Sequence, residues 1–344
     1  MISRTYVNGV IAAKEKYFLG EKLLRLTETD AARALRALKE SGFGGDSESA
    51  ENGNFSTDEA ETLIAAEEAK TNAFIREYAG SEAEREYFLS PLDSHNVKAY
   101  FKAKITGAEA AEMLAPEGAV PLKKIAEAFE KEDFSLLPAY LGAAVKQAEN
   151  VCENGAAGKG AEVGAAFEKA LYGHLLEACK GAGKARRALR GALQEKADLT
   201  NLVTALRSSS ESAAAKQYVP CGLLSAEDFG FCFAESGELA EKAYNKACAG
   251  AGGAKKKALK AAYDLYLNAK ETGSVAAAEK RLAETEIRLF EARKYELSGS
   301  EPFLYYVLRK KTECANVRAT MVCLNAGLKD SEIKKRLRGI WICI

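Results

Sequence analysis

The polar residues with the most regular spacing in this 344-residue chain belong to one short pattern that occurs three times. In each copy an acidic residue stands three positions before an asparagine, and leucine or valine follows the asparagine. Successive asparagines lie 105 and 115 residues apart, which is the length of a small domain. The three pairs are Asp93 with Asn96, Asp198 with Asn201, and Glu313 with Asn316.

The chemistry that this pattern favours is hydrogen bonding. Residues three apart lie on one face of a helix, so the acid and the asparagine of each pair point the same way. A buried amide left without a partner costs about 1–3 kcal/mol. We therefore expect each pair to tie its helix to the backbone of a neighbouring helix or loop, identically in each copy. A chance match is the competing interpretation, but near-equal spacing favours a triplicated chain.

Patterns for catalysis, nucleotide binding or metal binding are weak. His95 and His174 lie in different copies of the repeat, and the eight cysteines form no C-x-x-C pair, so zinc-ligand spacing is missing. The glycine-lysine stretches at Lys159, Lys184 and Lys255 lack the spacing of a phosphate-binding loop. The sequence therefore predicts no active site, no cofactor and no metal, with the cysteines as small buried apolar residues.

The elements that carry these residues are predicted to be helices. Alanine, leucine, glutamate and lysine dominate, and apolar residues recur at steps of three and four over 19–38, 129–141, 263–269 and 282–290. No convincing alternating strand occurs. Capping boxes start helices at Ser56 and Ser81, with Glu59 and Glu84 three positions later, and Pro302 fits the first turn of another helix.

Glycine-rich and polar stretches divide the chain. Residues 42–54, 155–164, 181–183 and 249–254 are predicted loops, whereas 107–121 and 208–220 are predicted joints between units. The result is an all-α protein of three helical repeats, at 1–115, 116–218 and 219–344.

Net charge and hydropathy disfavour two classes of protein, nucleic-acid binders and membrane-spanning proteins. The chain has 49 basic and 49 acidic side chains, and this balance disfavours a nucleic-acid binder. Basic clusters at 184–190, 255–260, 309–311 and 334–338 nevertheless keep nucleic-acid binding as an alternative, beside a generic helical scaffold. No apolar run of about 18 residues and no signal peptide occur, so we expect a cytoplasmic protein.

In the order and spacing of its motifs, the sequence resembles the C-type subunit of the prokaryotic V/A-type rotary ATPases, which is related to the d-type subunit of the eukaryotic V-type enzymes. The resemblance runs from Tyr6 to Leu337. It is carried by Asp93-x-x-Asn96-Val97-Lys98, Asp198-x-x-Asn201-Leu202, Glu313-x-x-Asn316-Val317-Arg318 and the segment from Gly327 to Leu337.

The resemblance implies a non-catalytic rotor subunit. Three similar helical domains would surround a central opening with pseudo-threefold symmetry, like a funnel. The protein would sit on the membrane proteolipid ring and receive the foot of the central shaft, formed by D- and F-type subunits. Such a chain would act at the membrane through its complex, as a single copy. Neither the coupled ion, H⁺ or Na⁺, nor the direction of the ATP reaction can be read from this sequence.

Basic residues after the asparagines are candidates for the surface that receives the shaft, which we call the shaft seat. Two sit two positions later and two sit six positions later; they are Lys98, Arg318, Lys102 and Arg207. A solvated helix face is an equally good interpretation of them. The third copy departs from the pattern, with Glu313 in place of aspartate and Val322 in place of the later basic residue. The apolar tail around Trp341 has no assigned use.

Overall fold

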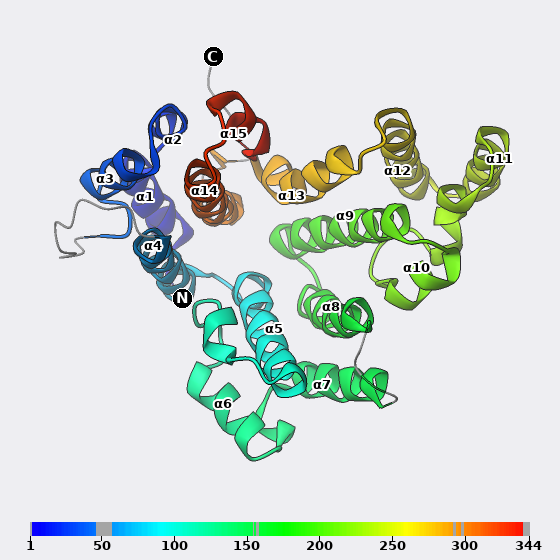
Figure 1. Ribbon diagram of the computed structural model, residues 1–344, viewed down its shortest axis with the longest axis horizontal. Helices are drawn as coiled ribbons and strands as arrows, with labels where there is room; N and C mark the ends of the chain where they lie inside the picture. The colour runs from blue at the N-terminus through cyan, green and yellow to red at the C-terminus, as the bar shows by residue number, and fades with distance from the viewer. Residues whose placement is uncertain are drawn as a thin grey trace. The chain divides into compact units, whose positions relative to one another are not determined.

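The structure is a computed structural model that describes residues 2–45, 57–153, 155, 158–291, 294–296 and 299–339. These residues form helices joined by turns and loops, with no strand among them, which confirms the predicted all-α class (Figure 1). The chain folds into two compact units. Unit 1 combines both ends of the chain, Met1–Ser81 and Glu286–Ile344, and unit 2 is Glu82–Thr285.

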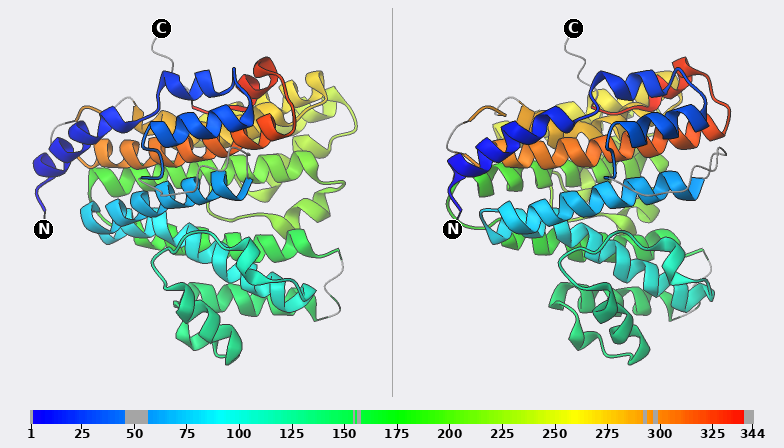
Figure 2. Two further views of the ribbon diagram at one scale, coloured as in Figure 1. Left: turned by 60° about the vertical axis from the view of Figure 1, so that its left-hand side comes forward. Right: turned by 90° about the vertical axis from the view of Figure 1, so that its left-hand side faces the viewer.

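Unit 1 is organised around one long helix from the C-terminal part of the chain. This helix, α14, runs beside α4 and also contacts α1, α2, α3 and α15 (Figure 2). Pro302 occupies its first turn, as predicted. The helices are α1 (Arg4–Lys14), η1 (Glu15–Tyr17), α2 (Glu21–Leu26), α3 (Ala31–Glu40), α4 (Thr57–Tyr78), the end of α13 (Ala276–Glu291), α14 (Glu301–Asn325) and α15 (Asp330–Arg336).

Unit 2 contains two further long helices, α5 and α9, and the shorter elements that pack on them. The C-terminal half of each long helix contacts elements that follow it in the chain. The elements are α5 (Glu82–Thr106), η2 (Ala110–Met113), α6 (Leu122–Glu130), η3 (Phe134–Leu136), α7 (Ala139–Cys152), α8 (Gly160–Ala178), α9 (Lys184–Arg207), α10 (Glu211–Gln217), η4 (Ala226–Phe233), α11 (Gly237–Cys248), α12 (Gly253–Thr272) and most of α13.

Several of the predicted loops and joints contain helical residues. The run 208–220 is not only a joint, because it contains helix α10, whose first turn is capped by Ser210. The glycine tract 155–164 is helical from Gly160 onward, since α8 begins there. Helices α4 and α5 begin directly after the predicted caps, although Ser56 and most of the loop 42–54 lie outside the described residues.

None of the helices described combines the length and the apolar composition that crossing a membrane requires.

Candidate functional site

The three asparagines of the repeated pattern each bind the backbone of a loop that lies downstream. The Asn201 side chain accepts a hydrogen bond from Val219 N at 2.8 Å and donates one to Val219 O at 2.9 Å. Asn316 makes the same two bonds with Arg338, at 2.9 and 2.8 Å. Asn96 accepts a bond from Ala115 N at 2.8 Å. In all three copies the asparagine therefore ties its helix to loop backbone.

The first copy is held a little differently. The Asn96 side chain is fully buried, and its Nδ2 atom has no hydrogen-bond partner among the described residues. The neighbouring His95 is exposed and lies with Nε2 at 2.9 Å from the carbonyl oxygen of Met113, the last residue of η2. His95 thus contacts η2, just before the loop to which Asn96 makes a single hydrogen bond.

The acidic residues of the first two copies bind a second point on the same loops. Asp93 accepts hydrogen bonds from Ala119 N and Val120 N, both at 3.0 Å. Asp198 accepts them from Leu223 N at 3.1 Å and Leu224 N at 3.0 Å. We call each acid–asparagine pair, together with the backbone that it binds, a clamp. Clamp 1 holds residues 115–120 and clamp 2 holds residues 219–224.

The two clamped loops share a sequence that the repeat search missed. Aligned on the residue bound by asparagine, both read apolar-Pro-x-Gly-apolar-apolar, and Gly118 corresponds to Gly222. A Cβ atom at Gly118 would lie 2.3 Å from Asp93 Oδ1, and one at Gly222 would lie 1.8 Å from Asp198 Oδ1. Both positions therefore require glycine for steric reasons, because the aspartate carboxylate lies directly against the glycine backbone. Proline followed two positions later by glycine, some 20 residues after Asn96 and Asn201, was the available signal.

Clamp 3 joins the two ends of the chain. Its asparagine holds Arg338, but Glu313 Oε1 accepts a hydrogen bond from Leu19 N at 2.6 Å, from the beginning of the sequence. The other carboxylate oxygen, Oε2, lies 3.0 Å from Lys310 Nζ. The third copy therefore holds the loop that precedes α2, as the first two copies hold the loops that precede α6 and η4.

The hydrophobic cores repeat the arrangement of the clamps: each of the first two clamp helices contacts later elements, and the last clamp helix contacts the first elements of the chain. Val97, Leu202 and Val317, each next to its clamp asparagine, are fully buried in three separate cores. The first core joins α5 to α6, α7 and α8, and the second joins α9 to η4, α11, α12 and α13. The third joins α14 to α2, α3 and α4. Each clamp helix thus forms a core with the elements after it, and the last clamp helix with the first elements.

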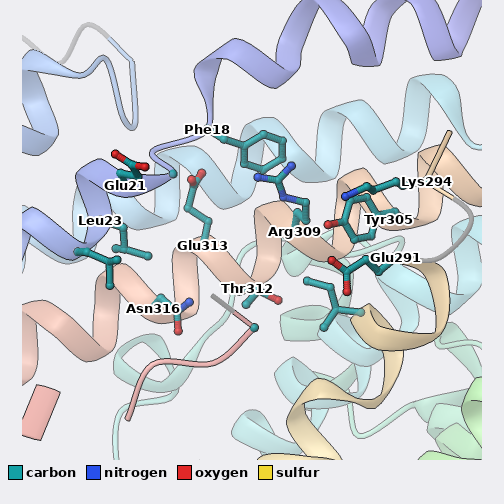
Figure 3. A pocket seen from close by; sticks show the side chains of 14 residues that line it. Phe18, Glu21, Leu23, Glu291, Lys294, Tyr305, Arg309, Thr312, Glu313 and Asn316 are labelled. Carbon is teal, nitrogen blue, oxygen red and sulfur yellow. The ribbon is translucent and has the colours of Figure 1, made fainter. Parts of the chain in front are cut away.

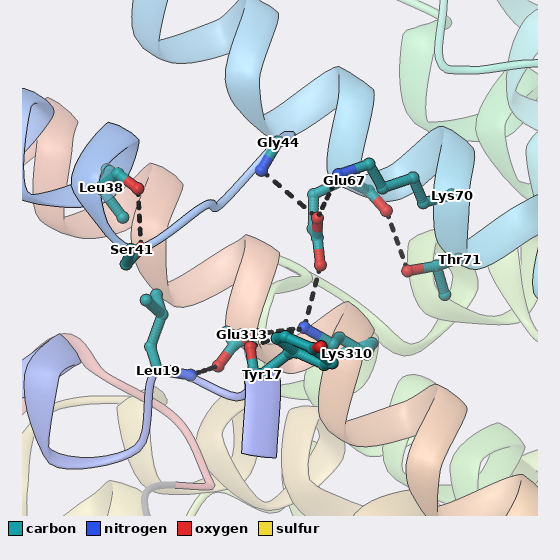
Figure 4. Close-up of polar contacts among 10 residues, drawn as sticks. All are labelled: Tyr17, Leu19, Leu38, Ser41, Gly44, Glu67, Lys70, Thr71, Lys310 and Glu313. Atoms are coloured by element: carbon teal, nitrogen blue, oxygen red, sulfur yellow. Dashed lines mark hydrogen bonds and ion pairs between the residues drawn. The ribbon is translucent and has the colours of Figure 1, made fainter. Parts of the chain in front are cut away.

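A buried group of charges lies beside clamp 3 (Figure 4). Lys310 on α14 lies with Nζ 2.9 Å from Glu67 Oε1 on α4 and is only 4% exposed. Glu67 also accepts a bond from Gly44 N at 3.3 Å. Burial alone would lower the pKa of Lys310, but Glu313 and Glu67 hold it above its ordinary value. The ammonium is therefore charged and pairs with both carboxylates of this buried site, and in addition Lys70 Nζ lies 3.7 Å from Glu67 Oε2.

The two glutamates respond differently to this site. Burial raises the pKa of Glu313, and Lys310 only partly offsets that effect. Burial also works against the charged form of Glu67, yet the bonds from Lys310 and the backbone keep its pKa below the ordinary value. In clamp 2, burial raises the pKa of Asp198 to about 6 although two backbone amides favour the carboxylate.

Comparison with protein families decides the assignment. A model of the ATP synthase (C/AC39) subunit family matches residues 7–336. The chain belongs to this family. The match covers nearly the whole sequence and confirms the resemblance to the C-type and d-type subunits that the three motifs indicated. A comparison with curated proteins gives no match.

In this C/AC39 family chain, the four basic residues proposed for the shaft seat have different surroundings. Lys102 and Arg207 are exposed, and Arg207 pairs with Glu279. Lys98 is half-buried, and burial lowers its pKa. Val322, which replaces the later basic residue in the third copy, is exposed.

Arg318 is bound within unit 1. Its guanidinium contacts Glu61 at 3.0 Å and Glu68 at 3.2 Å, both on α4. Arg318 thus joins α14 to α4, whereas Lys98, Lys102 and Arg207 belong to unit 2. Their common role as a shaft seat stays a prediction.

His174 and the described cysteines of this family member are at least partly buried. His174 lies with Nε2 2.8 Å from Glu86 and stacks on Tyr140 with 4.0 Å between ring centroids. The seven described cysteines are free and are buried or half-buried. Among the described residues, no group of histidine, cysteine, aspartate and glutamate side chains has the geometry to hold a metal.

Proposed function

We propose that this chain is a non-catalytic coupling subunit of a V/A-type rotary ATPase, which joins the central shaft to the membrane proteolipid ring. Membership of the C/AC39 family gives the complex. The observation that carries the coupling role is the cyclic order of the three clamps, in which the last clamp helix holds the first loop.

A cyclic series of contacts favours a closed arrangement of three related segments around an opening. Each segment is fixed to the next by backbone hydrogen bonds from buried side chains, so that a load on one is shared by its neighbours. Close-packed helical cores resist deformation, and a part that transmits torque needs this property. We therefore propose the pseudo-threefold, funnel-like arrangement for the three repeats 1–115, 116–218 and 219–344.

The proposed partners are the D- and F-type subunits of the shaft on one side and the proteolipid ring on the other. A shaft without threefold symmetry fits three related surfaces best through charged groups, because several long side chains can adjust to unequal contacts. Lys102 and Arg207 are the exposed basic residues at equivalent positions of the first two copies. Through these partners the chain acts at the membrane surface without entering the bilayer.

Binding measurements with purified shaft and ring proteins test this proposal. The unmodified chain should bind both, and the double substitution Lys102→Glu with Arg207→Glu should weaken shaft binding about tenfold or more, as close charge pairs at interfaces do when reversed. Lys123→Glu on α6, an exposed lysine outside the clamp helices, is the matched control. Unchanged shaft affinity in the double variant would remove the proposed seat. A wild-type chain that binds neither shaft nor ring would remove the coupling role.

A further inference from the structure

In unit 2, helices α11 and α12 pack side by side as a hairpin, and charge of a single sign gathers where they join (Figure 1). Residues 242–260 contain six lysines and no acidic residue, although acids and bases are equally numerous over the whole chain. One of the six, Lys255, is half-buried and pairs with Asp228 at 2.7 Å. The other five are exposed, and we call them the lysine patch: Lys242, Lys246, Lys256, Lys257 and Lys260.

The hairpin is fixed on the second hydrophobic core, so the patch has a defined place on the surface of unit 2. Tyr244 on α11 stacks on Tyr263 on α12 with 4.2 Å between ring centroids. Ala240 and Leu259 are fully buried in the core. The lysines lie on the opposite faces of the two helices. Apart from Asn245, every other exposed residue of 242–260 is alanine or glycine, so the lysine side chains extend beyond their neighbours.

The charge of the patch is not balanced within the described part of the chain. None of its five lysines forms an ion pair with a described acidic residue. Lysines four residues apart repel each other on one helix face, as Lys242 and Lys246 do on α11 and Lys256 and Lys260 do on α12. The first turn of α12 also has no acidic residue, although the helix macrodipole disfavours lysine near this end. An anionic partner would relieve this repulsion.

We propose that the lysine patch binds the anionic headgroups of a lipid membrane. Clusters of about four to eight basic residues on a helix surface favour anionic lipids. A lysine ammonium is a point charge on a flexible stem and needs no fixed partner geometry, which suits mobile headgroups. The inference rests on the proposed function only for the nearness of a membrane, because the contact itself involves neither the shaft nor the ring.

The composition of the patch favours lipid over an acidic protein or a nucleic acid. Residues 242–260 contain no arginine, and their single aromatic ring, that of Tyr244, is stacked on Tyr263. Protein interfaces are enriched in arginine and aromatic residues and depleted of lysine. Binding of single-stranded nucleic acid relies on exposed aromatic rings. The exposed acids Glu241 and Asp264 border the patch on the two helices and would repel an extended phosphate backbone.

The charged cavity of unit 1 lacks this single sign (Figure 3). It has a volume of about 280 Å³ and lies between α2, the end of α13 and α14. Acidic and basic side chains both line it, and they are Glu21, Glu291, Glu313, Lys294 and Arg309. Charges of opposite sign offset one another there, so an anionic partner is favoured at the lysine patch and not at this cavity.

Binding of the isolated chain to vesicles tests the proposal. At an ionic strength of about 0.1 M the chain should bind vesicles of two parts phosphatidylcholine to one part phosphatidylglycerol, but not vesicles of phosphatidylcholine alone. Raising the ionic strength to about 1 M should release it, because the Debye length falls from about 10 Å to about 3 Å. Each lysine near an anionic surface strengthens binding about fivefold, so the triple substitution Lys256→Gln, Lys257→Gln and Lys260→Gln should weaken binding about a hundredfold.

A second triple variant with the same change of charge is the control. Lys123→Gln, Lys124→Gln and Lys146→Gln fall at exposed positions of α6 and α7 in the same unit and should leave the vesicle affinity nearly unchanged. Exposed substitutions of this kind have little effect on folding, so both variants should keep the circular dichroism spectrum of the wild type.

Three results would overturn the proposal. One is a wild-type chain that does not bind the anionic vesicles, and another is an equal loss of binding in the two triple variants. The third is tighter binding to a generic oligonucleotide than to the vesicles, lost in the patch variant, which would assign the patch to nucleic acid. None of these results affects the coupling role, because that role is tested separately with the shaft and ring proteins.

Discussion

At the scale of single residues, the molecule depends on close contacts between carboxylates and backbone. Asp93 and Asp198 each accept two backbone bonds, and this geometry leaves Gly118 and Gly222 no space for a side chain. Neither glycine has a φ angle in the left-handed region, so the requirement is steric. Substituting them therefore changes the clamp itself.

Gly222→Ala should lower the free energy of unfolding by about 2–4 kcal/mol, because the new methyl group must displace Asp198 from its two buried amides. Denaturant unfolding measures this loss. Gly191→Ala on α9 is the control, since a Cβ atom there has nothing within 4 Å. Alanine inside a helix is favoured over glycine by about 0.5–1 kcal/mol, so the control should be neutral or stabilised. Equal effects of the two substitutions would contradict the steric account.

The raised pKa of Asp198 makes clamp 2 sensitive to pH. The folded-state pKa of about 6 exceeds the unfolded value, so the folded chain binds more protons between pH 4 and 6. The contribution of this group to stability is therefore greatest below pH 4 and falls as pH rises through 6, by about 2–3 kcal/mol. Asp198→Asn removes the titration. The stability difference between wild type and variant should shrink from pH 4 to pH 7, and a constant difference would refute the assignment.

Single residues could be predicted from the sequence where a side chain needs hydrogen-bond partners and also recurs at regular spacing. The asparagines were found because a buried amide needs partners and the pattern occurs three times. Gly118 and Gly222 were missed because glycine is common in loops, and only the position of Asp198 shows why it is needed. Glu67 was missed because nothing in a glutamate-rich helix distinguishes a buried carboxylate from its exposed neighbours.

At the scale of elements, α14 combines a packing face with buried charges. It lies on α4 through the third core and also carries Lys310, which forms ion pairs with Glu67 and Glu313. Phe18 covers this group, with the Lys310 ammonium 4.7 Å and the Arg309 guanidinium 4.0 Å from the ring centroid. The position of α14 is therefore specified by polar contacts as well as by apolar area.

Lys310→Met should destabilise the protein by about 3–5 kcal/mol, because it leaves Glu313 buried without a cation and Glu67 with only the exposed Lys70 at 3.7 Å. The triple variant Lys310→Met, Glu67→Gln and Glu313→Gln should recover most of this loss, since no charge then remains buried. Thermal or denaturant unfolding compares the two. Lys131→Met, which breaks an exposed pair with Glu127, should leave the stability nearly unchanged, because water screens that pair. A triple variant as unstable as the single one would show that the charges themselves are not responsible.

The elements were largely predictable because amphipathic helices leave a strong periodic signal. The break between α2 and α3 follows from the polar residues Thr27, Glu28, Thr29 and Asp30, and Asp30 caps α3 by accepting a bond from Arg33 N at 2.8 Å. Helix α10 was missed because its seven residues bury no side chain. A short helix without a core-facing stripe gives no periodicity to detect.

At the scale of the whole molecule, unit 1 is completed only by the two ends of the chain together. Leu19 N binds Glu313, and the carbonyl oxygen of Tyr17 lies 3.5 Å from Lys310 Nζ. The division at 115 and 218 stays a prediction, since the clamps and cores link neighbouring repeats as closely as they build each one. Sequence spacing predicted three repeats but not that each hydrophobic core contains residues from two of them.

Removal of residues 1–20 should loosen α14 while leaving unit 2 intact. The deletion takes away Leu19 and Phe18, so Glu313 loses its backbone partner and Lys310 its cover. Hydrogen exchange should become faster over residues 310–317 by a factor of ten or more, since one lost charged hydrogen bond is worth about 1.5–3 kcal/mol. Helices α5 and α9 serve as internal reference. Uniform acceleration across both units, or none in α14, would contradict this assignment.

The joining of both chain ends in clamp 3 has a consequence for biosynthesis. Helices α2, α3 and α4 emerge early from the ribosome, but α14, on which their apolar faces pack, is made more than 220 residues later. Because synthesis adds about 5–20 residues per second, these apolar faces stay without their partner helix for tens of seconds. Unit 2 is complete by then. We therefore expect α2, α3 and α4 to expose their apolar faces during translation, when a chaperone could cover them.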